Sequence, residues 1–325
     1  MNRIIFTFHA SRFTIIFTVK LAITEKFVHD MKRGFIFLSL AAFAWGWPNV
    51  LIKLLSTDFD PVTQAFFRYL SAGITVFILC FILDRKKLVV ARQNMKMLVA
   101  PVIIVTAHQI TYVSGVYLTS AVAASLIAKL NAIFIPALSF VVLVEERHIV
   151  KNAAFLSGTF WALIGVAGVI FGKGYSLDNS VNLGFVELIF STVLWSVYAV
   201  MIKRVVARID PVAITAMVPL MSCILFLPIV ALCGNFHRIV EVSMTSRLLL
   251  IVSGLLSIGV GNVFYYSALK YIGLSIASSF LLITPLLTGV LSFFILNEKL
   301  TGTQLAFSAV LLCGCFLITR VKRKV

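Results

Sequence analysis

The sequence predicts an all-α polytopic membrane protein with ten transmembrane helices, arranged as two inverted five-helix repeats. Three observations lead to this class. The 325 residues are 61% hydrophobic and only 12% charged, about half the charged fraction of a typical soluble domain. Long stretches without Asp, Glu, Lys or Arg recur along the chain, and they lack the two-residue alternation of transmembrane barrel strands. The two halves of the sequence also repeat one another.

The first of these observations defines ten segments that are long and apolar enough to cross a bilayer as helices. Residues 97–144 carry a single charge, Lys129, and are too long for one span, so we divide them at Leu118-Thr119-Ser120. The expected spans are, in order, 34–54, 62–83, 97–118, 121–144, 153–172, 183–203, 212–233, 248–269, 274–297 and 302–320.

The basic residues predict the orientation of these spans. With both chain ends in the cytoplasm, and counting the loop residues from Lys32 onward, 17 Lys and Arg lie inside and five lie outside, as the positive-inside rule favours. Most of the basic residues behind the net charge of +16 would then lie at one membrane face, and nucleic acid is not an expected partner. We therefore predict a multi-pass protein of the cytoplasmic membrane, with cytoplasmic termini and a basic cytoplasmic tail at 321–325.

The first 33 residues are predicted to form an N-terminal extension. Their apolar stretches 4–6 and 15–17 are interrupted by His9 and Arg12, which does not fit a signal peptide. Two interpretations stay open: an interfacial amphipathic segment, and a translation start at Met31 that would leave the earlier residues outside the native protein.

An internal repeat relates the two halves at a shift of 150 residues. Trp45 then aligns with Trp195, and Asp60-Pro61-Val62 aligns with Asp210-Pro211-Val212. Matches of Trp and of Asp-Pro-Val in one register rarely arise by chance. Because each half has an odd number of spans, the second enters the membrane from the opposite face. Such inverted repeats are typical of secondary transporters, whose substrate site lies near the bilayer midplane at the repeat interface.

Several residues in this pattern carry a resemblance to a known family. They are the Gly-led first span with Trp45, Asp60-Pro61 followed by Arg68, the small-residue start of span four that ends on Glu145, and Pro285 followed by Glu298-Lys299. Through them the halves 34–174 and 183–320 resemble the paired EamA domains of the drug/metabolite transporter superfamily. The resemblance implies export or exchange of small metabolites without ATP, through a central cavity lined by spans one, three, four, six, eight and nine. Lys129 is not part of the general pattern, so the substrate is expected to be particular to a subgroup.

Ionisable residues inside the spans are costly and are functional candidates by default. Lys129 lies near the midplane, where it could bind a substrate carboxylate or phosphate, or serve as a structural partner of Glu187 or of backbone carbonyls. Since the family pattern includes an Arg at position 68 across unrelated substrates, Arg68 is expected to have a structural or gating role. Glu187, near the outer end of span six, could pair with either cation, take up a proton, or remain a partly solvated carboxylate.

Polar residues at the centres of other spans are further candidates. His108 could couple proton movement because imidazole titrates near neutrality, or it could be a packing histidine whose hydrogen bonds are satisfied. Asn49, Gln109 and Asn262 are candidates for hydrogen bonds between helices or to substrate. Asn131 follows Lys129 by two residues and is expected on a different helix face.

Aromatic residues on the spans that the resemblance assigns to the cavity could enclose an amphipathic substrate. They are Trp45, Tyr112, Trp195, Tyr198 and Tyr265. A glycine series at 165, 168 and 172 in span five indicates a packing or dimer face.

The function expected from these observations is secondary transport, by alternating access, of an amino acid or a related amphipathic or anionic metabolite, with export as the expected direction. The alternative is a multidrug-type efflux carrier for apolar or cationic compounds. An enzyme is not expected, because the spans hold no nucleophile–base set, and neither a cofactor nor a metal is expected beyond proton coupling. The expected partners are the substrate and the lipid bilayer. The sequence does not specify the substrate, the coupling ion or the oligomeric state.

Overall fold

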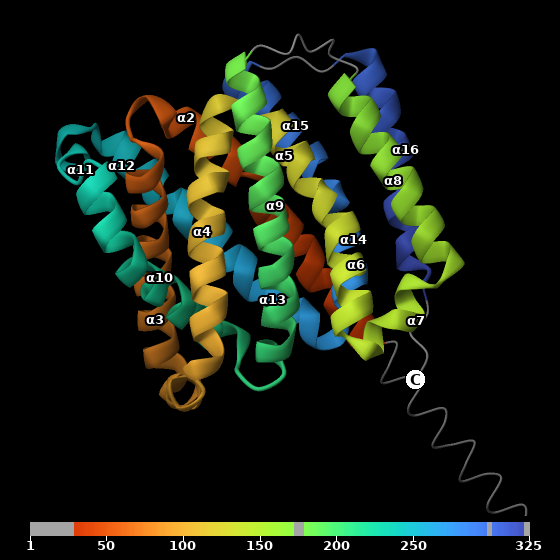
Figure 1. Ribbon diagram of the computed structural model, residues 1–325, viewed down its shortest axis with the longest axis horizontal. Coiled ribbons are helices and arrows are strands. Elements are labelled where there is room, and N and C mark those ends of the chain that lie inside the picture. Colours follow the sequence, from red (N-terminus) through yellow and green to blue (C-terminus); the bar gives the residue numbers. More distant parts are fainter. Residues whose placement is uncertain (1–28, 172–178, 298–300, 322–325) are drawn as a thin grey trace, which may run out of the picture.

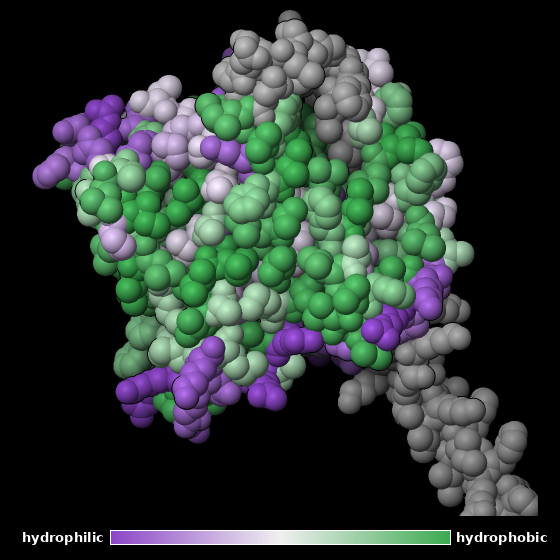
Figure 2. All heavy atoms as spheres, in the orientation of Figure 1, coloured by the Kyte–Doolittle hydropathy of each residue, from purple (hydrophilic) through white to green (hydrophobic). Residues whose placement is uncertain are grey.

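The computed structural model describes residues 29–171, 179–297 and 301–321, and within these ranges all regular secondary structure is helical (Figure 1). Residues 1–28 and 322–325 lie outside them, so the expected N-terminal extension and most of the basic tail lie outside the described residues. On the face drawn in Figure 2, a broad apolar belt lies between hydrophilic side chains at the two ends of the molecule. The all-α membrane fold predicted from composition is therefore confirmed.

The helices of the two halves follow the same order. The first half contains a helical stretch His29–Thr57 that includes α2 Pro48–Leu54 and η1 Leu55–Thr57, then α3 Pro61–Gln93, α4 Lys96–Leu118, α5 Ala121–Ile127, η2 Ala128–Leu130, α6 Asn131–Val142, η3 Val144–Glu146, α7 Arg147–Val150 and α8 Ala153–Phe171. The second half contains α9 Asn179–Val206, α10 Pro211–Cys233, α11 Arg238–Glu241, α12 Met244–Gly254, η4 Leu255–Gly261, α13 Asn262–Tyr271, α14 Leu274–Phe280, η5 Leu281–Ile283, α15 Thr284–Leu296 and α16 Gly302–Thr319.

Eight helical stretches of the described residues are long and apolar enough to span a bilayer, and each coincides with one expected span. The other two expected spans, 153–172 and 302–320, contain the shorter apolar helices Ala153–Gly165 and Leu305–Ile318. These belong to α8 and α16, which lie side by side at one edge of the molecule in Figure 1. The count of ten spans therefore stays a prediction.

The pairing of α8 with α16 depends on glycine. Gly158 and Gly314 face each other so closely that a Cβ on Gly314 would lie 2.4 Å from the Ala162 nitrogen. Gly165 lies equally close to Leu311, where a Cβ would meet its nitrogen at 2.5 Å. The face expected from the glycine series, as far as Gly168, thus packs within the chain. Gly172 is outside the described residues.

Aspartate caps begin the second helix of each half. Asp60 accepts hydrogen bonds from the backbone N–H groups of Val62 and Thr63, and Asp210 accepts one from Val212. A proline follows each aspartate, at a position where its missing N–H costs nothing. The repeated Asp-Pro pair therefore marks the same local structure twice.

Both halves also break one span at the same repeat position. The 3₁₀ turns η2 and η5 interrupt spans four and nine, and their residues 128–130 and 281–283 are related by the 153-residue shift that relates Tyr112 to Tyr265. Span eight contains a further irregularity, the π-helical segment η4. Such departures from the α-helix often mark functional positions, and in membranes they are tolerated where they line a cavity.

Candidate functional site

A cavity of about 120 Å³ lies where the irregular segments of the two halves meet. Helices from both halves contribute to it, which is the position expected for a transporter with inverted repeats. The volume is below the roughly 300–1,000 Å³ of typical ligand pockets, so a metabolite would need the helices to move apart. The lining residues are Trp45, Pro48, Asn49, Arg68, Tyr69, His108, Gln109, Tyr112, Ser125, Ala128, Lys129, Asn131, Thr192, Trp195, Ser257, Ile258, Asn262, Leu281 and Thr284.

Nine of the twelve residues expected at a site from the sequence line this cavity. They are Trp45, Asn49, Arg68, His108, Gln109, Tyr112, Lys129, Trp195 and Asn262. The remaining three, Tyr198, Glu187 and Tyr265, are not among its lining residues. Most of the residues selected from the sequence thus line one cavity, and their roles there stay predictions.

Arg68 is almost fully buried, at 1% exposure, about two turns from the start of α3. Its Nη2 donates to the Ser257 hydroxyl at 2.9 Å. Its Nε and Nη1 are buried and have no hydrogen-bond partner among the described residues. A charged side chain at the bilayer centre costs roughly 2.5–3.5 kcal/mol on insertion scales. One hydrogen bond to a charged group is worth about 1.5–3 kcal/mol, so Ser257 alone at best just offsets that cost.

Ser257 holds Arg68 and a cavity tryptophan together. Its hydroxyl accepts from Arg68 and donates to the Ser253 carbonyl at 2.6 Å, and its own carbonyl accepts from Trp45 Nε1 at 3.0 Å. A π-helical turn displaces carbonyls from their regular i−4 partners, and the Ser257 carbonyl lies in such a turn. A Cβ on Gly261 would lie 2.4 Å from Trp45 Nε1, so the tryptophan needs glycine there.

Lys129 lies in the 3₁₀ turn η2 and is 8% exposed. Asn131 lines the same cavity, which corrects the expectation that it would lie on a different face. The reason is the helix type: a 3₁₀ turn advances about 120° per residue rather than 100°, so the two residues are separated by a smaller angle. Asn131 Oδ1 is buried and has no hydrogen-bond partner among the described residues.

Amides and tyrosines form the polar part of the wall. Asn49 Oδ1 accepts from the Tyr112 hydroxyl at 2.6 Å, and Gln109 Oε1 accepts weakly from Tyr69 at 3.5 Å. Tyr69 was not expected from the sequence, because its position after Arg68 resembles that of any core aromatic. These bonds join α2, α3 and α4 around the cavity.

An aromatic group forms another part of the wall. The Trp45 and Trp195 rings meet edge to face with centroids 5.5 Å apart. Tyr265 is 1% exposed and packs behind them, 4.9 Å from Trp45, which explains its absence from the lining. Tyr198 is fully buried and hydrogen-bonds Tyr266 instead of facing the cavity. The repeat-related tryptophans therefore form one surface on which an apolar group could rest.

His108 joins α4 to α9 at the edge of this aromatic group. Its Nδ1 lies 3.0 Å from the Ser191 carbonyl and 2.8 Å from the Ser191 hydroxyl. A carbonyl can only accept, so a hydrogen bond to it requires the tautomer with the proton on Nδ1, whereas the hydroxyl contact allows either tautomer. The ring packs 5.2 Å from Trp195. These contacts fit the interpretation of His108 as a packing histidine, while proton coupling stays a prediction.

Glu187 is half-buried on α9 and lies outside the cavity lining. Its Oε2 is buried and has no hydrogen-bond partner among the described residues. The expected pairing with Arg68 is not found among the described ion pairs, since Arg68 donates to Ser257 instead.

The charge of the cavity lining is uniform in sign. Arg68 and Lys129 are its cations, and its described lining residues include no Asp or Glu. Ser257 and Thr192, which sequence analysis did not select, add hydroxyl groups. Small hydroxyl residues are common in membrane helices as packing groups, so no sequence signal separates these two from the rest.

Comparison with known proteins gives a consistent result. The family model of the EamA-like transporter family matches residues 32–171 and again 182–320. An uncharacterized transporter of Haemophilus influenzae is 22% identical over 86% of this chain and 94% of its own. The uncharacterized transporter YoaV of Bacillus subtilis is 24% identical over 85% and 92%, and one from Archaeoglobus fulgidus is 25% identical over 89% and 98%. A crystal structure with 16% identity superposes with a TM-score of 0.71 over 87% of this chain and 95% of that one, which indicates a shared fold.

Proposed function

Because the chain belongs to the EamA-like transporter family, we propose that it is a secondary transporter for a small amphipathic organic anion, such as an amino acid or a related carboxylate. The observation that carries the proposal is the charge of the central cavity. Arg68 and Lys129 line it together, and its described lining residues include no Asp or Glu. A buried guanidinium is costly unless it is paired, and Arg68 keeps two donors without a partner among the described residues.

Each part of the lining has a partner on such a substrate. Arg68 offers the two donors, Nε and Nη1, that remain without a partner among the described residues. Lys129 adds a second positive charge, and Asn49 and Gln109 supply amide groups that can both donate and accept. The paired rings of Trp45 and Trp195 accommodate the apolar part of the molecule.

The inverted repeat supports alternating access as the mode of transport. Two halves related by a two-fold axis in the membrane plane can exchange conformations, which yields inward-open and outward-open states of similar energy. Lys53 donates to the Tyr117 carbonyl, and its repeat mate Lys203 donates to the carbonyls of Leu269 and Ile272. The two lysines thus tie corresponding helix ends at opposite faces. The excess of basic residues on one face supports cytoplasmic termini in the cytoplasmic membrane, and export is the proposed direction.

The alternative, a multidrug-type carrier, has one feature in its favour. The aromatic wall of Trp45 and Trp195, with Tyr265 packed behind it, could hold apolar compounds without a charge. A cationic compound would instead meet Arg68 and Lys129 in a site of low dielectric, where like charges repel strongly. The charge of the bound compound therefore separates the two functions.

A binding series on the purified protein tests the proposal. The thermal unfolding midpoint is measured with indole-3-propionate, its amide and tryptamine, which share one ring and differ in charge. The carboxylate should raise the midpoint in the wild type, and Lys129→Gln should weaken its binding by about tenfold. Lys151→Gln, an exposed lysine outside the cavity, should leave it unchanged. Equal or stronger stabilisation by tryptamine would favour the multidrug alternative.

A further inference from the structure

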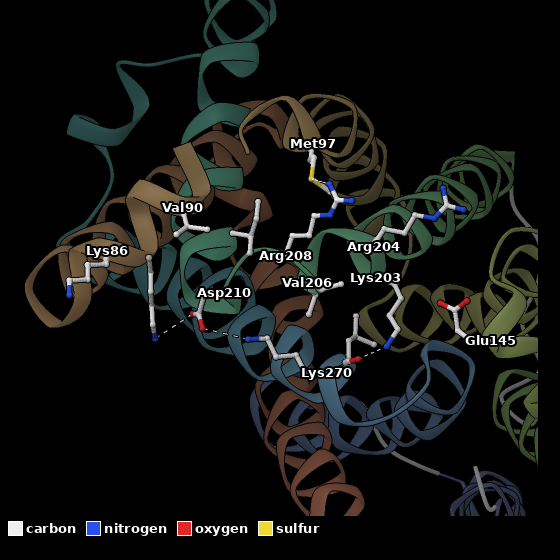
Figure 3. A pocket seen from close by; sticks show the side chains of 14 residues that line it. Lys86, Val90, Met97, Glu145, Lys203, Arg204, Val206, Arg208, Asp210 and Lys270 are labelled. Atoms are coloured by element: carbon white, nitrogen blue, oxygen red, sulfur yellow. Dashed lines mark hydrogen bonds and ion pairs between the residues drawn. The ribbon is translucent and has the colours of Figure 1, made fainter. Parts of the chain in front are cut away.

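A second hollow, of about 1,050 Å³, opens at the face of the molecule where α3, α9 and α13 end and α4 and α10 begin (Figure 3). We call it the basic pocket. Its charged lining residues comprise six cations and two carboxylates, Lys86, Lys87, Lys203, Arg204, Arg208 and Lys270 with Glu145 and Asp210. A concave surface with such a surplus of positive charge attracts anions more strongly than a flat basic fringe does.

Some of these charged residues already form ion pairs between the two halves. Asp210 lies 3.6 Å from Lys87 of the first half and 3.6 Å from Lys270 of the second. Lys203 donates to the Leu269 and Ile272 carbonyls at the end of α13. Asp210 also caps α10, so these contacts fix the floor of the pocket.

The two arginines of the pocket have only uncharged acceptors among their described hydrogen bonds. Arg208 contacts the Met97 sulfur at 3.9 Å, and Arg204 donates to the Val142 carbonyl at 3.0 Å. Figure 3 shows both guanidinium groups at one side of the pocket, that of Arg204 on α9 and that of Arg208 in the turn after it. A guanidinium presents five N–H donors in a planar fork that matches phosphate oxygens. The arginines are therefore available for an anion of that shape.

The surface beside the pocket indicates whether the anion belongs to a lipid or to a soluble compound. α3 is kinked at Asp84 (φ −161°, ψ 81°) and continues into the segment that carries Lys86 and Lys87. Around the kink, Leu83 is 80% exposed and Val89 is 54% exposed, and Val90, which itself lines the pocket, is 40% exposed. Figure 2 shows hydrophilic side chains at this end of the molecule, next to the apolar belt. The acyl chains of a lipid would pack against these exposed apolar side chains, whereas a soluble anion would make no such contact.

We propose that the basic pocket binds the phosphodiester headgroup of an anionic phospholipid, with the acyl chains along the exposed side of α3. Basic pockets between transmembrane helices are known to take such headgroups. The lipid would join α9 to the kinked end of α3 and so reinforce the Lys87–Asp210–Lys270 contact between the halves. The site is separate from the central cavity, and the proposal does not depend on which compound is transported.

The test measures the thermal midpoint of the full-length protein in nanodiscs of phosphatidylcholine, with and without phosphatidylglycerol. Phosphatidylglycerol should raise the midpoint by several degrees, and native mass spectrometry should find it retained. Inorganic phosphate and glycerol 3-phosphate, added to phosphatidylcholine nanodiscs, should produce no such rise. If they match the lipid, the pocket is a site for soluble anions and the lipid proposal is wrong.

A matched pair of double variants separates the pocket from general attraction to a basic face. Arg204→Gln with Arg208→Gln should abolish the rise given by phosphatidylglycerol. Arg92→Gln with Lys96→Gln removes two exposed charges near the same face, outside the pocket, and should preserve it. An equal loss in both double variants, or no response to phosphatidylglycerol in the wild type, would overturn the proposal. Both variants are first checked for an unchanged midpoint in phosphatidylcholine alone, which separates lipid binding from folding.

Discussion

At the scale of single residues, the guanidinium of Arg68 lies in the spanning part of α3 with one described hydrogen bond, to Ser257. Sequence analysis assigned Arg68 a structural or gating role and Lys129 the contact with substrate. The structure places both on one cavity, and the two unpartnered donors of Arg68 are suited to an anion. We therefore propose a direct role in binding for Arg68 in addition to Lys129.

Ser257→Ala tests how Arg68 is held. The change removes the hydroxyl acceptor of Arg68, so we expect a loss of about 1–2 kcal/mol in stability together with weaker binding of the carboxylate. The measurements are the thermal midpoint and the ligand-induced shift. Ser253→Ala is the matched control, because Ser253 is equally buried, one turn earlier, and its hydroxyl has no hydrogen-bond partner among the described residues. Equal effects of the two changes would argue against a special role for Ser257.

At the scale of elements, the two halves are connected by a helix cap that sequence analysis missed. Glu146 is fully buried, and its carboxylate accepts from the backbone N–H groups of Leu274 at 2.7 Å and Ser275 at 3.1 Å. It thereby satisfies the first turn of α14, where a negative charge also complements the helix dipole. The sequence pattern had singled out Glu145, its exposed neighbour.

Glu146→Ala should leave two buried N–H groups of α14 without acceptors. We expect a cost of about 1–3 kcal/mol, visible as a lower thermal midpoint in detergent. Glu145→Ala removes the same group from an exposed position and should change stability by no more than about 0.5 kcal/mol. If the two variants unfold at the same temperature, the cap does not stabilise the fold as described.

The edge pair of α8 and α16 gives a second prediction at this scale. Gly314→Ala would place a Cβ 2.4 Å from the Ala162 nitrogen and 2.7 Å from the Gly158 carbonyl oxygen, both backbone atoms that cannot rotate away. We expect destabilisation of about 1–3 kcal/mol from overpacking. Gly302→Ala, at the start of α16, meets no atom within 4 Å and serves as the control. A neutral Gly314→Ala would mean that α8 and α16 are not packed so closely.

At the scale of the whole molecule, hydropathy and the internal repeat were enough to predict the fold class and the helical segments. Those signals are strong because a bilayer leaves few solutions for backbone hydrogen bonds. Much of the cavity could also be predicted, since ionisable and amide residues at bilayer depth are rare and tend to face one another. Trp45 and Trp195 followed from their repeat relation, and they do meet in the structure.

The remaining features depend on geometry that no local pattern encodes. The π-helical segment around Ser257 and the 3₁₀ turn that carries Lys129 decide which side chains reach the cavity. Tyr265 was expected in the lining because it lies on a span that the resemblance assigns to the cavity, and it instead packs behind Trp45. The sequence of an all-apolar helix shows little hydrophobic periodicity, because lipid and protein neighbours are both apolar. It therefore does not reveal which way a side chain points.

Counterflow in proteoliposomes tests the central claim, transport of an organic anion through the cavity between the halves, most directly. Vesicles are loaded with the unlabelled carboxylate that stabilises the protein best, and entry of the labelled compound is followed. We predict transient accumulation in the wild type, competition by other carboxylates but not by tryptamine, and loss of accumulation in Arg68→Gln and Lys129→Gln proteins that retain the wild-type fold. Counterflow that tryptamine inhibits as well as carboxylates do, or that persists in both variants, would contradict the account.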